Sequence, residues 1–233
     1  MPLSQIPLPF AQFDRLDFDT FLPGRNETAL TSIIRVAQGR ETGNHYLWGQ
    51  AGTGKSHLLQ AVSTMASDHG LRVAYVPLAC IDELSPGMFQ GLETLDLVCI
   101  DDLHVLAGSD AWEQALFHLF NRMRGVRHPL VMTADRSPPD SGIRLPDLNS
   151  RLAWDLVFHL EPLDEASLVK ALKNRAHARM FAFPDEVLEF LVRRVSRDAR
   201  DLFSLLDRLD NASLSSKKKI TIPFVKEILD IKK

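Results

Sequence analysis

The chain shows two patterns of hydrophobic and polar positions, one after the other. In the first part, short continuous apolar runs alternate with segments in which apolar residues recur at helical spacing. Continuous apolar runs separated by helices are typical of buried parallel strands, so this part is expected to form an α/β sandwich. The runs that predict strands cover residues 45–48, 72–77, 97–100, 130–133 and 156–160.

Helices are expected around and between these strands. A first helix is predicted to begin at Asn26, a residue type that often caps helix N-termini, and to continue to Gly39. Stronger helical patterns cover residues 55–67 and 111–124, and a weaker one covers residues 80–93.

After Pro162 only helical spacing remains, and Pro223 is predicted to open a last short helix. We therefore expect a tail at residues 1–12, an α/β domain at residues 13–163 and a small helical domain at residues 164–233. The apolar stripes of the helical part are Leu168, Leu172, Ala176 and Met180; Val187, Leu188, Leu191 and Val195; and Leu202, Leu205, Leu206 and Leu209.

Composition changes this picture little. The 233 residues are 45% hydrophobic and 24% charged, which excludes a disordered chain. No apolar run is long enough to span a bilayer, so no membrane association is expected. The two cysteines, Cys80 and Cys99, lack metal-ligand spacing, so neither a zinc site nor a disulfide framework is predicted, and the cytoplasm is the expected location.

Charge is distributed unevenly along the chain. The net charge is −3, but residues 164–233 carry 15 Lys and Arg against 11 Asp and Glu, a net of +4. This leaves 12 against 19, a net of −7, for residues 1–163. The asymmetry suggests a polyanionic or acidic partner for the C-terminal part, although chance surface variation explains it equally well.

The strongest motif is Gly49-Gln50-Ala51-Gly52-Thr53-Gly54-Lys55-Ser56, which fits the phosphate-binding pattern GxxxxGK[S/T] between a predicted strand and a predicted helix. The glycines allow backbone N–H groups to wrap a phosphate chain at a helix N-terminus. Lys55 is expected to reach the terminal phosphates, and the Ser56 hydroxyl to bind Mg²⁺. The residues predicted to hold the cofactor here are Gly49, Ala51, Gly52, Thr53, Gly54, Lys55, Ser56 and His57.

Two acids end the predicted strand at 97–100. Asp101 is expected to hold Mg²⁺ through water, and Asp102 could polarise an attacking water. The strand at 130–133 should lie between the strand before the phosphate motif and the Asp101 strand. Either Thr133 or Asp135 could then sense the terminal phosphate, although a simple turn at the strand end is nearly as good a reading.

Taken in order, these motifs resemble the AAA+ ATPases, and more narrowly the DnaA branch of bacterial replication initiators. The resemblance also uses Ser150-Arg151-Leu152, Arg200-Asp201-Leu202 and the stretch from Asp19 to Asn26. It implies a five-stranded parallel sheet between helices, followed by a helical lid. It further implies base contacts near Phe21, Leu22 and Asn26, an arginine finger at Arg151 acting in trans, and a lid arginine at Arg200 that reaches the bound nucleotide.

Two further features narrow the resemblance to the Hda family of DnaA-related regulators. The chain stops soon after the lid, so no DNA-binding domain is expected, and Gln5-Ile6-Pro7-Leu8-Pro9-Phe10 resembles a sliding-clamp-binding peptide. Gln5, Leu8 and Phe10 are the predicted contact residues. The implied partners are DnaA and the DNA polymerase III beta sliding clamp, with DNA met mainly through the clamp and a homodimer or larger homo-oligomer possible. The implied cofactors are Mg²⁺ and ADP or another nucleoside diphosphate, with ATP possible.

The implied activity is stimulation of hydrolysis of DnaA-bound ATP, which limits replication initiation. Asp102 replaces the glutamate found in most AAA+ hydrolases, and the strand at 130–134 lacks the usual sensor Asn, so fast ATP hydrolysis by this chain is in doubt. A DnaC-like helicase loader or autonomous AAA+ ATPase is the alternative; DNA-stimulated turnover would distinguish it. A metabolic kinase is a weaker third reading.

Overall fold

The computed structural model describes residues 16–178, 183–196, 198–216 and 218–229. Its α/β unit contains a five-stranded, entirely parallel sheet in the order β2-β3-β4-β1-β5. The predicted fold class is therefore confirmed, including the position of β4 between β1 and β3. The strands are β1 (His45–Trp48), β2 (Val73–Pro77), β3 (Leu97–Asp101), β4 (Leu130–Ala134) and β5 (Leu156–His159).

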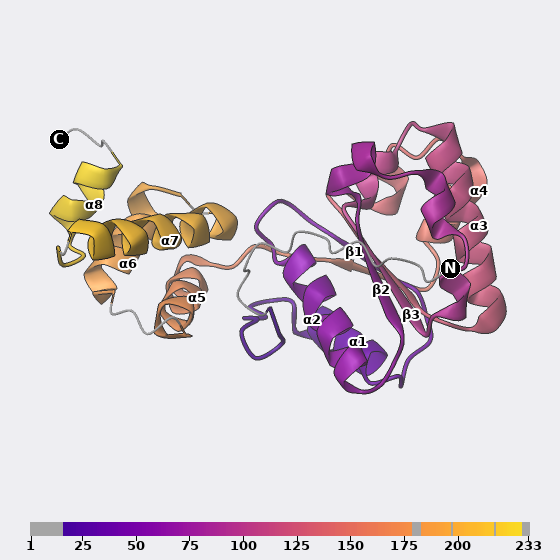
Figure 1. The fold of residues 1–233 in the computed structure, drawn as a ribbon, viewed down its shortest axis with the longest axis horizontal. Helices are drawn as coiled ribbons and strands as arrows, with labels where there is room; N and C mark the ends of the chain where they lie inside the picture. The colour runs from indigo at the N-terminus through magenta and orange to yellow at the C-terminus, as the bar shows by residue number, and fades with distance from the viewer. Residues whose placement is uncertain (1–15, 179–182, 197, 217, 230–233) are drawn as a thin grey trace, which may run out of the picture.

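Side chains of the buried strands alternate between two cores, one on each face of the sheet. In β3, Leu97 and Cys99 pack on one face and Val98 and Ile100 on the other. Helices α1 (Glu27–Ala37) and α2 (Lys55–Asp68) cover the first face. Helices α3 (Asp110–Val126) and α4 (Pro146–Leu152) cover the second, as Figure 1 shows.

The weak helix predicted at residues 80–93 is wrong. This stretch forms three 3₁₀ turns at Leu78–Glu83, Pro86–Phe89 and Leu92–Thr94. Pro86 cannot donate a backbone hydrogen bond, and Gly91 adopts φ 82°, so a continuous helix is interrupted twice. Helix α4 was not predicted, because seven residues are too few to show a clear period.

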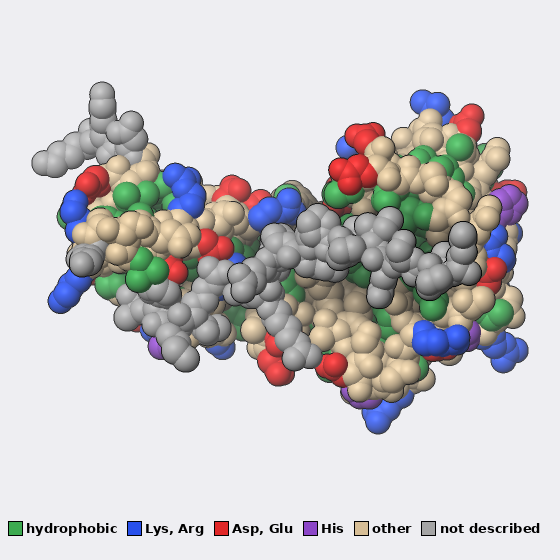
Figure 2. Space-filling model, viewed as in Figure 1, with side chains coloured by type: hydrophobic (Ala, Val, Ile, Leu, Met, Phe, Trp, Pro, Cys, Tyr) green, Lys and Arg blue, Asp and Glu red, His purple; other side chains and the backbone are tan. Residues whose placement is uncertain are grey.

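The lid is a separate bundle of helices α5 (Glu165–Ala178), α6 (Asp185–Arg194), α7 (Ala199–Ser216) and α8 (Ile222–Ile228). The predicted stripes on α5, α6 and α7 build its core, although Met180 lies outside the described residues. Figure 2 shows the two units as two lobes. In the described part of the chain, no helix has both the length and the apolar character needed to cross a membrane.

Asn26 connects the two ends of the α/β unit instead of capping α1 with its side chain. It occupies the N-cap position, but its side chain makes no capping hydrogen bond. Its Nδ2 donates to the Glu161 carbonyl oxygen at 2.9 Å, and its Oδ1 accepts from the Glu161 N–H at 2.8 Å. Asn26 is only 5% exposed. The start of α1 is thus tied to the chain as it leaves β5.

Candidate functional site

The phosphate-binding motif lies between the end of β1 and the start of α2, as predicted from the sequence. Two of its glycines are required by close contacts. A Cβ on Gly49 would lie 2.5 Å from the Leu160 carbonyl oxygen, and one on Gly54 would lie 2.7 Å from the Phe21 ring. Gly54 also has φ 90°, which favours glycine. Neighbouring segments therefore pack closely against the loop and restrict its backbone conformation.

Lys55 is held inside this loop. Its Nζ donates to the carbonyl oxygens of Gly49 at 2.7 Å and Gln50 at 2.8 Å, and the residue is 7% exposed. Burial lowers the pKa of Lys55, while the charges of Asp102 and Asp101 oppose that shift. A buried ammonium group at the start of a helix fits a polyanionic ligand such as a phosphate chain.

Thr53 supports the loop, because its hydroxyl donates to the Gln50 carbonyl oxygen at 2.9 Å. Ala51 is exposed at the tip of the loop, and Ser56 is half-buried in the first turn of α2. These positions leave Ala51 and Ser56 accessible to a ligand.

Asp101 is buried at the end of β3 and accepts a hydroxyl hydrogen bond on each oxygen. Tyr75 donates to Oδ2 at 2.7 Å, and Thr133 donates to Oδ1. The Thr133 hydroxyl also accepts the backbone N–H of Asp102 at 2.9 Å. One threonine of β4 is therefore hydrogen-bonded to both acids at the end of β3.

Asp102 itself has φ 58°, an unusual conformation for a residue with a side chain. Burial and the neighbouring Asp101 raise its pKa, whereas His104, Lys55 and the lid residue Arg200 act against that rise. Asp135 lies further along, where its carboxylate accepts from Arg136 Nε at 3.2 Å.

Magnesium is compatible with this site. Mg²⁺ typically takes only one or two carboxylates and completes its shell with waters and substrate phosphates. Asp101 and Ser56 could supply that protein contribution beside the phosphate loop. Within the described residues there is no group of three or more His, Cys, Asp or Glu side chains that could hold a metal by themselves.

The N-terminus of lid helix α7 faces the phosphate loop. Asp198 precedes α7, and its Oδ1 accepts the Arg200 N–H at 2.7 Å. A Cβ on Gly52 would lie 2.5 Å from the same Oδ1. The positive charge of Arg200 adds to the lowering of the pKa of Lys55 and opposes the rise in the pKa of Asp102. These contacts bring the predicted lid arginine to the predicted phosphate site.

A short segment before α1 is fastened to the helix that follows the loop. His57 Nε2–H donates to the Asp17 carbonyl oxygen at 2.8 Å, and the Phe21 and His57 rings meet edge to face at 5.3 Å. Burial lowers the pKa of His57, which keeps the ring neutral near pH 7. Phe21 is buried and Leu22 half-buried. Because His57 and the Asn26 side chain bond to protein groups, their predicted nucleotide contacts would have to use other atoms or a rearrangement.

Arg151 lies in the last turn of α4. Its Cζ is 4.3 Å from the centroid of the Phe117 ring and 5.7 Å from that of Trp154. Arg124 Cζ lies 4.5 Å from the same Trp154 ring. Arg151 is half-buried, so part of the residue is accessible to solvent.

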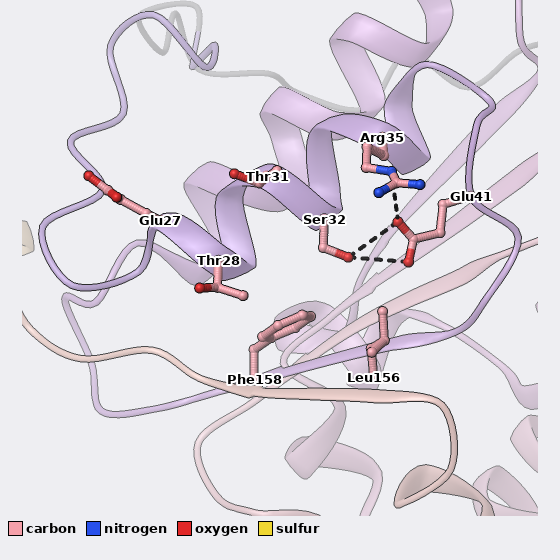
Figure 3. Close-up of a pocket in the computed structure, with 8 residues that line it drawn as sticks. All are labelled: Glu27, Thr28, Thr31, Ser32, Arg35, Glu41, Leu156 and Phe158. Atoms are coloured by element: carbon pink, nitrogen blue, oxygen red, sulfur yellow. Dashed lines mark hydrogen bonds and ion pairs between the residues drawn. The ribbon is translucent and has the colours of Figure 1, made fainter.

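A separate shallow groove lies between α1 and the edge strand β5 (Figure 3). Leu156 and Phe158 form its apolar side, and α1 contributes hydroxyls and Arg35. The Arg35 guanidinium pairs with Glu41 at 3.6 Å, and the Ser32 hydroxyl is 3.4 Å from each oxygen of that carboxylate. The polar groups that Figure 3 joins by dashed lines are thus bonded to one another.

Sequence reasoning missed four residues around these sites: Tyr75, Phe117, Trp154 and Asp198. The spacing of Trp154 three residues after Arg151, and of Asp198 two residues before Arg200, could have indicated the last two. The predicted clamp contacts Gln5, Leu8 and Phe10 lie outside the described residues.

Comparison with known families shows which family of proteins this chain belongs to. The model of the bacterial DnaA ATPase domain matches residues 13–159, which is most of the chain. This protein belongs to the DnaA ATPase family. The model of the Hda lid domain matches residues 164–229. A DnaA-type ATPase domain followed by an Hda lid makes the chain a DnaA-related AAA+ protein and a regulator of replication initiation.

Solved structures agree with this assignment. Domain III of the replication initiation protein DnaA from Thermotoga maritima is 25% identical, with a TM-score of 0.82 over 94% of this chain and 97% of that chain. AMPPCP-bound DnaA from Aquifex aeolicus is 22% identical, with a TM-score of 0.71 over 85% and 66%. The Thermotoga maritima Holliday junction branch migration motor RuvB is 17% identical, with a TM-score of 0.72 over 94% and 73%, and shares the fold.

Proposed function

We propose that this protein holds a nucleoside diphosphate at its own phosphate loop and stimulates hydrolysis of ATP bound to DnaA, with Arg151 acting in trans. The observation that carries the proposal is that a DnaA-type ATPase domain is followed by an Hda lid in one chain, and Arg151 in that ATPase domain is only half-buried. A guanidinium supplied in this way stabilises charge on the transferring phosphoryl group, and in other NTPases it accelerates hydrolysis by roughly 10³–10⁵.

The ligand of this chain is proposed to be ADP, with ATP as the other candidate, held with Mg²⁺. The AMPPCP-bound relative supports a nucleotide at this loop, and Lys55, Ser56 and Asp101 supply the groups that phosphate and Mg²⁺ need. Asp102 stands where most AAA+ hydrolases carry a glutamate, and its carboxylate is one methylene shorter, so it reaches less far toward an attacking water. We therefore expect this protein to activate DnaA more strongly than it hydrolyses ATP itself.

Docking on the sliding clamp through Gln5, Leu8 and Phe10 completes the proposal. It rests on the sequence of the tail, in which prolines restrict the chain and Leu8 and Phe10 can fill an apolar cleft. In this scheme DNA is met mainly through the clamp, in the cytoplasm, and copies of this protein could associate as a homodimer or a larger assembly.

The test is an ATP hydrolysis assay on DnaA with this protein, ADP, clamp and DNA, in which each component is omitted in turn. Arg151→Ala should abolish the stimulation while nucleotide affinity stays unchanged. Arg144→Ala, which removes an exposed guanidinium from the same unit, is the control. Normal stimulation by Arg151→Ala would refute the role in trans.

Two further arms separate the remaining parts of the proposal. Gln5→Ala combined with Phe10→Ala should lose both clamp binding in a pull-down and the clamp-dependent part of the stimulation. Substantial turnover by this protein alone that rises with single-stranded DNA would favour a helicase loader or an autonomous ATPase.

A further inference from the structure

We propose that Trp154 is a positioning residue for Arg151, holding its guanidinium in the orientation in which it meets the nucleotide of DnaA. This inference rests on the proposed function and adds to it a residue that makes no contact with the nucleotide itself.

The first observation is how closely the two residues are linked. Trp154 follows Arg151 by three residues, and its backbone N–H donates to the Arg151 carbonyl oxygen at 3.0 Å. The indole is therefore placed relative to the Arg151 backbone by the end of α4. The guanidinium then lies 5.7 Å from the indole centroid and 4.3 Å from the Phe117 centroid, within the range of cation–π contacts.

The second observation is the exposure of Trp154. Its side chain is 43% exposed, and the other large hydrophobic side chains that are similarly exposed in the described parts of the chain are aliphatic. An indole contributes little to the core in that position. It does contact two guanidiniums, those of Arg151 and Arg124, so its ring is used as a surface for cations.

The third observation concerns what does not hold Arg151. In the regions that the structure describes, no carboxylate forms a hydrogen bond or ion pair with it. A carboxylate would occupy N–H donors that a phosphate needs, whereas an aromatic face restrains the guanidinium plane and leaves its five donors available. Ring contacts therefore suit an arginine whose anionic partner arrives on another molecule. Restricting its rotamers in advance also lowers the entropy lost on engagement.

The experiment measures DnaA ATP hydrolysis against the concentration of this protein, with ADP, clamp and DNA present. Trp154→Ala should lower the maximal stimulated rate by roughly tenfold, with the half-saturating concentration changed by less than about twofold. Trp154→Phe should restore most of the rate because it keeps an aromatic face, and Trp154→Leu should not. Val126→Ala, which removes exposed apolar surface at the end of α3, is the control and should behave as wild type.

A second readout is independent of DnaA. Stacking over rings shifts the Nε–Hε resonance of Arg151 in NMR spectra of the isolated protein, and Trp154→Leu should reduce that shift while Trp154→Phe preserves it. Circular dichroism melting confirms that each variant folds. Because Trp154 is largely at the surface, all three are expected to do so.

Each other outcome has a definite meaning. A normal maximal rate for Trp154→Ala, beside a lost rate for Arg151→Ala, would overturn the positioning role and leave the proposed function standing. A raised half-saturating concentration alone would make Trp154 a docking residue and would also overturn it. Full activity of Trp154→Leu would do the same, since the aromatic face would not be needed. Normal stimulation by Arg151→Ala would instead reject the proposed function.

Discussion

Removing the Thr133 hydroxyl tests whether one side chain holds both acids at the end of β3. In Thr133→Val the shape is nearly kept, but the bond to Asp101 and the bond from the Asp102 N–H are lost. A hydrogen bond to a charged group contributes about 1.5–3 kcal/mol, and an unsatisfied buried N–H costs about 1–3 kcal/mol. Both losses come from one hydroxyl group, and Tyr75 still donates to Asp101, so they do not add in full. We therefore expect the free energy of unfolding to fall by about 2–4 kcal/mol.

Urea unfolding followed by tryptophan fluorescence measures this change. Trp48, Trp112 and Trp154, the three tryptophans of the chain, belong to the α/β unit, so the signal reports on that unit. With an m value of about 2 kcal/mol per molar urea, the midpoint should fall by about 1–2 M.

Thr133→Ser provides the control for that measurement, because it keeps the hydroxyl and loses one methyl group, at a cost of about 1 kcal/mol. If Thr133→Val were no less stable than Thr133→Ser, the hydroxyl would not be holding Asp101 and Asp102, and the account of this site would be wrong.

Two further predictions concern the lid and pH. Gly52→Ala places a Cβ 2.5 Å from Asp198 Oδ1 at a residue with φ 77°, so the Asp198 side chain or the loop must shift, and affinity for a fluorescent nucleotide should fall by about tenfold or more. Asp198→Ala in the same chain should recover part of that affinity, and unchanged affinity of Gly52→Ala would contradict the contact. Burial lowers the pKa of His45 and His57, so below about pH 6.5 the unfolded chain binds more protons than the folded one. The unfolding free energy should then decrease by up to about 1.4 kcal/mol per pH unit for each histidine as pH falls, until the lowered pKa is reached. Urea midpoints measured over that range should depend less on pH in His45→Gln, and an equal dependence would count against the burial argument.

Much of the α/β unit could be predicted because its strands are buried on both faces. A strand such as Leu97–Asp101 is then a continuous apolar run, and parallel order brings the ends of β1, β3 and β4 to one edge. That is why the phosphate loop, Asp101 and Thr133 could be expected together before any contact was known.

The contacts that were missed join elements far apart in sequence. Tyr75 reaches Asp101 across neighbouring strands, and Phe117 on α3 meets Arg151 on α4. Apolar spacing reports only which face of one element is buried. It therefore predicted that Phe117 belongs to a helix, but not that its ring contacts Arg151. At residues 80–93 the spacing misled, because Pro86 overrides the helical period.

The Asn26–Glu161 contact also limits the length of the linker between the α/β unit and the lid. Both backbone polar groups of Glu161 are bonded to Asn26, and Asp164, directly before α5, accepts the Ser167 N–H on its side chain at 2.8 Å. Only Pro162 and Leu163 remain between them, and the proline ring restricts φ at the first. A rotation of the lid relative to the α/β unit is therefore expected to occur at these two residues, and it would change the distance between Arg200, in the first turn of α7, and the phosphate loop.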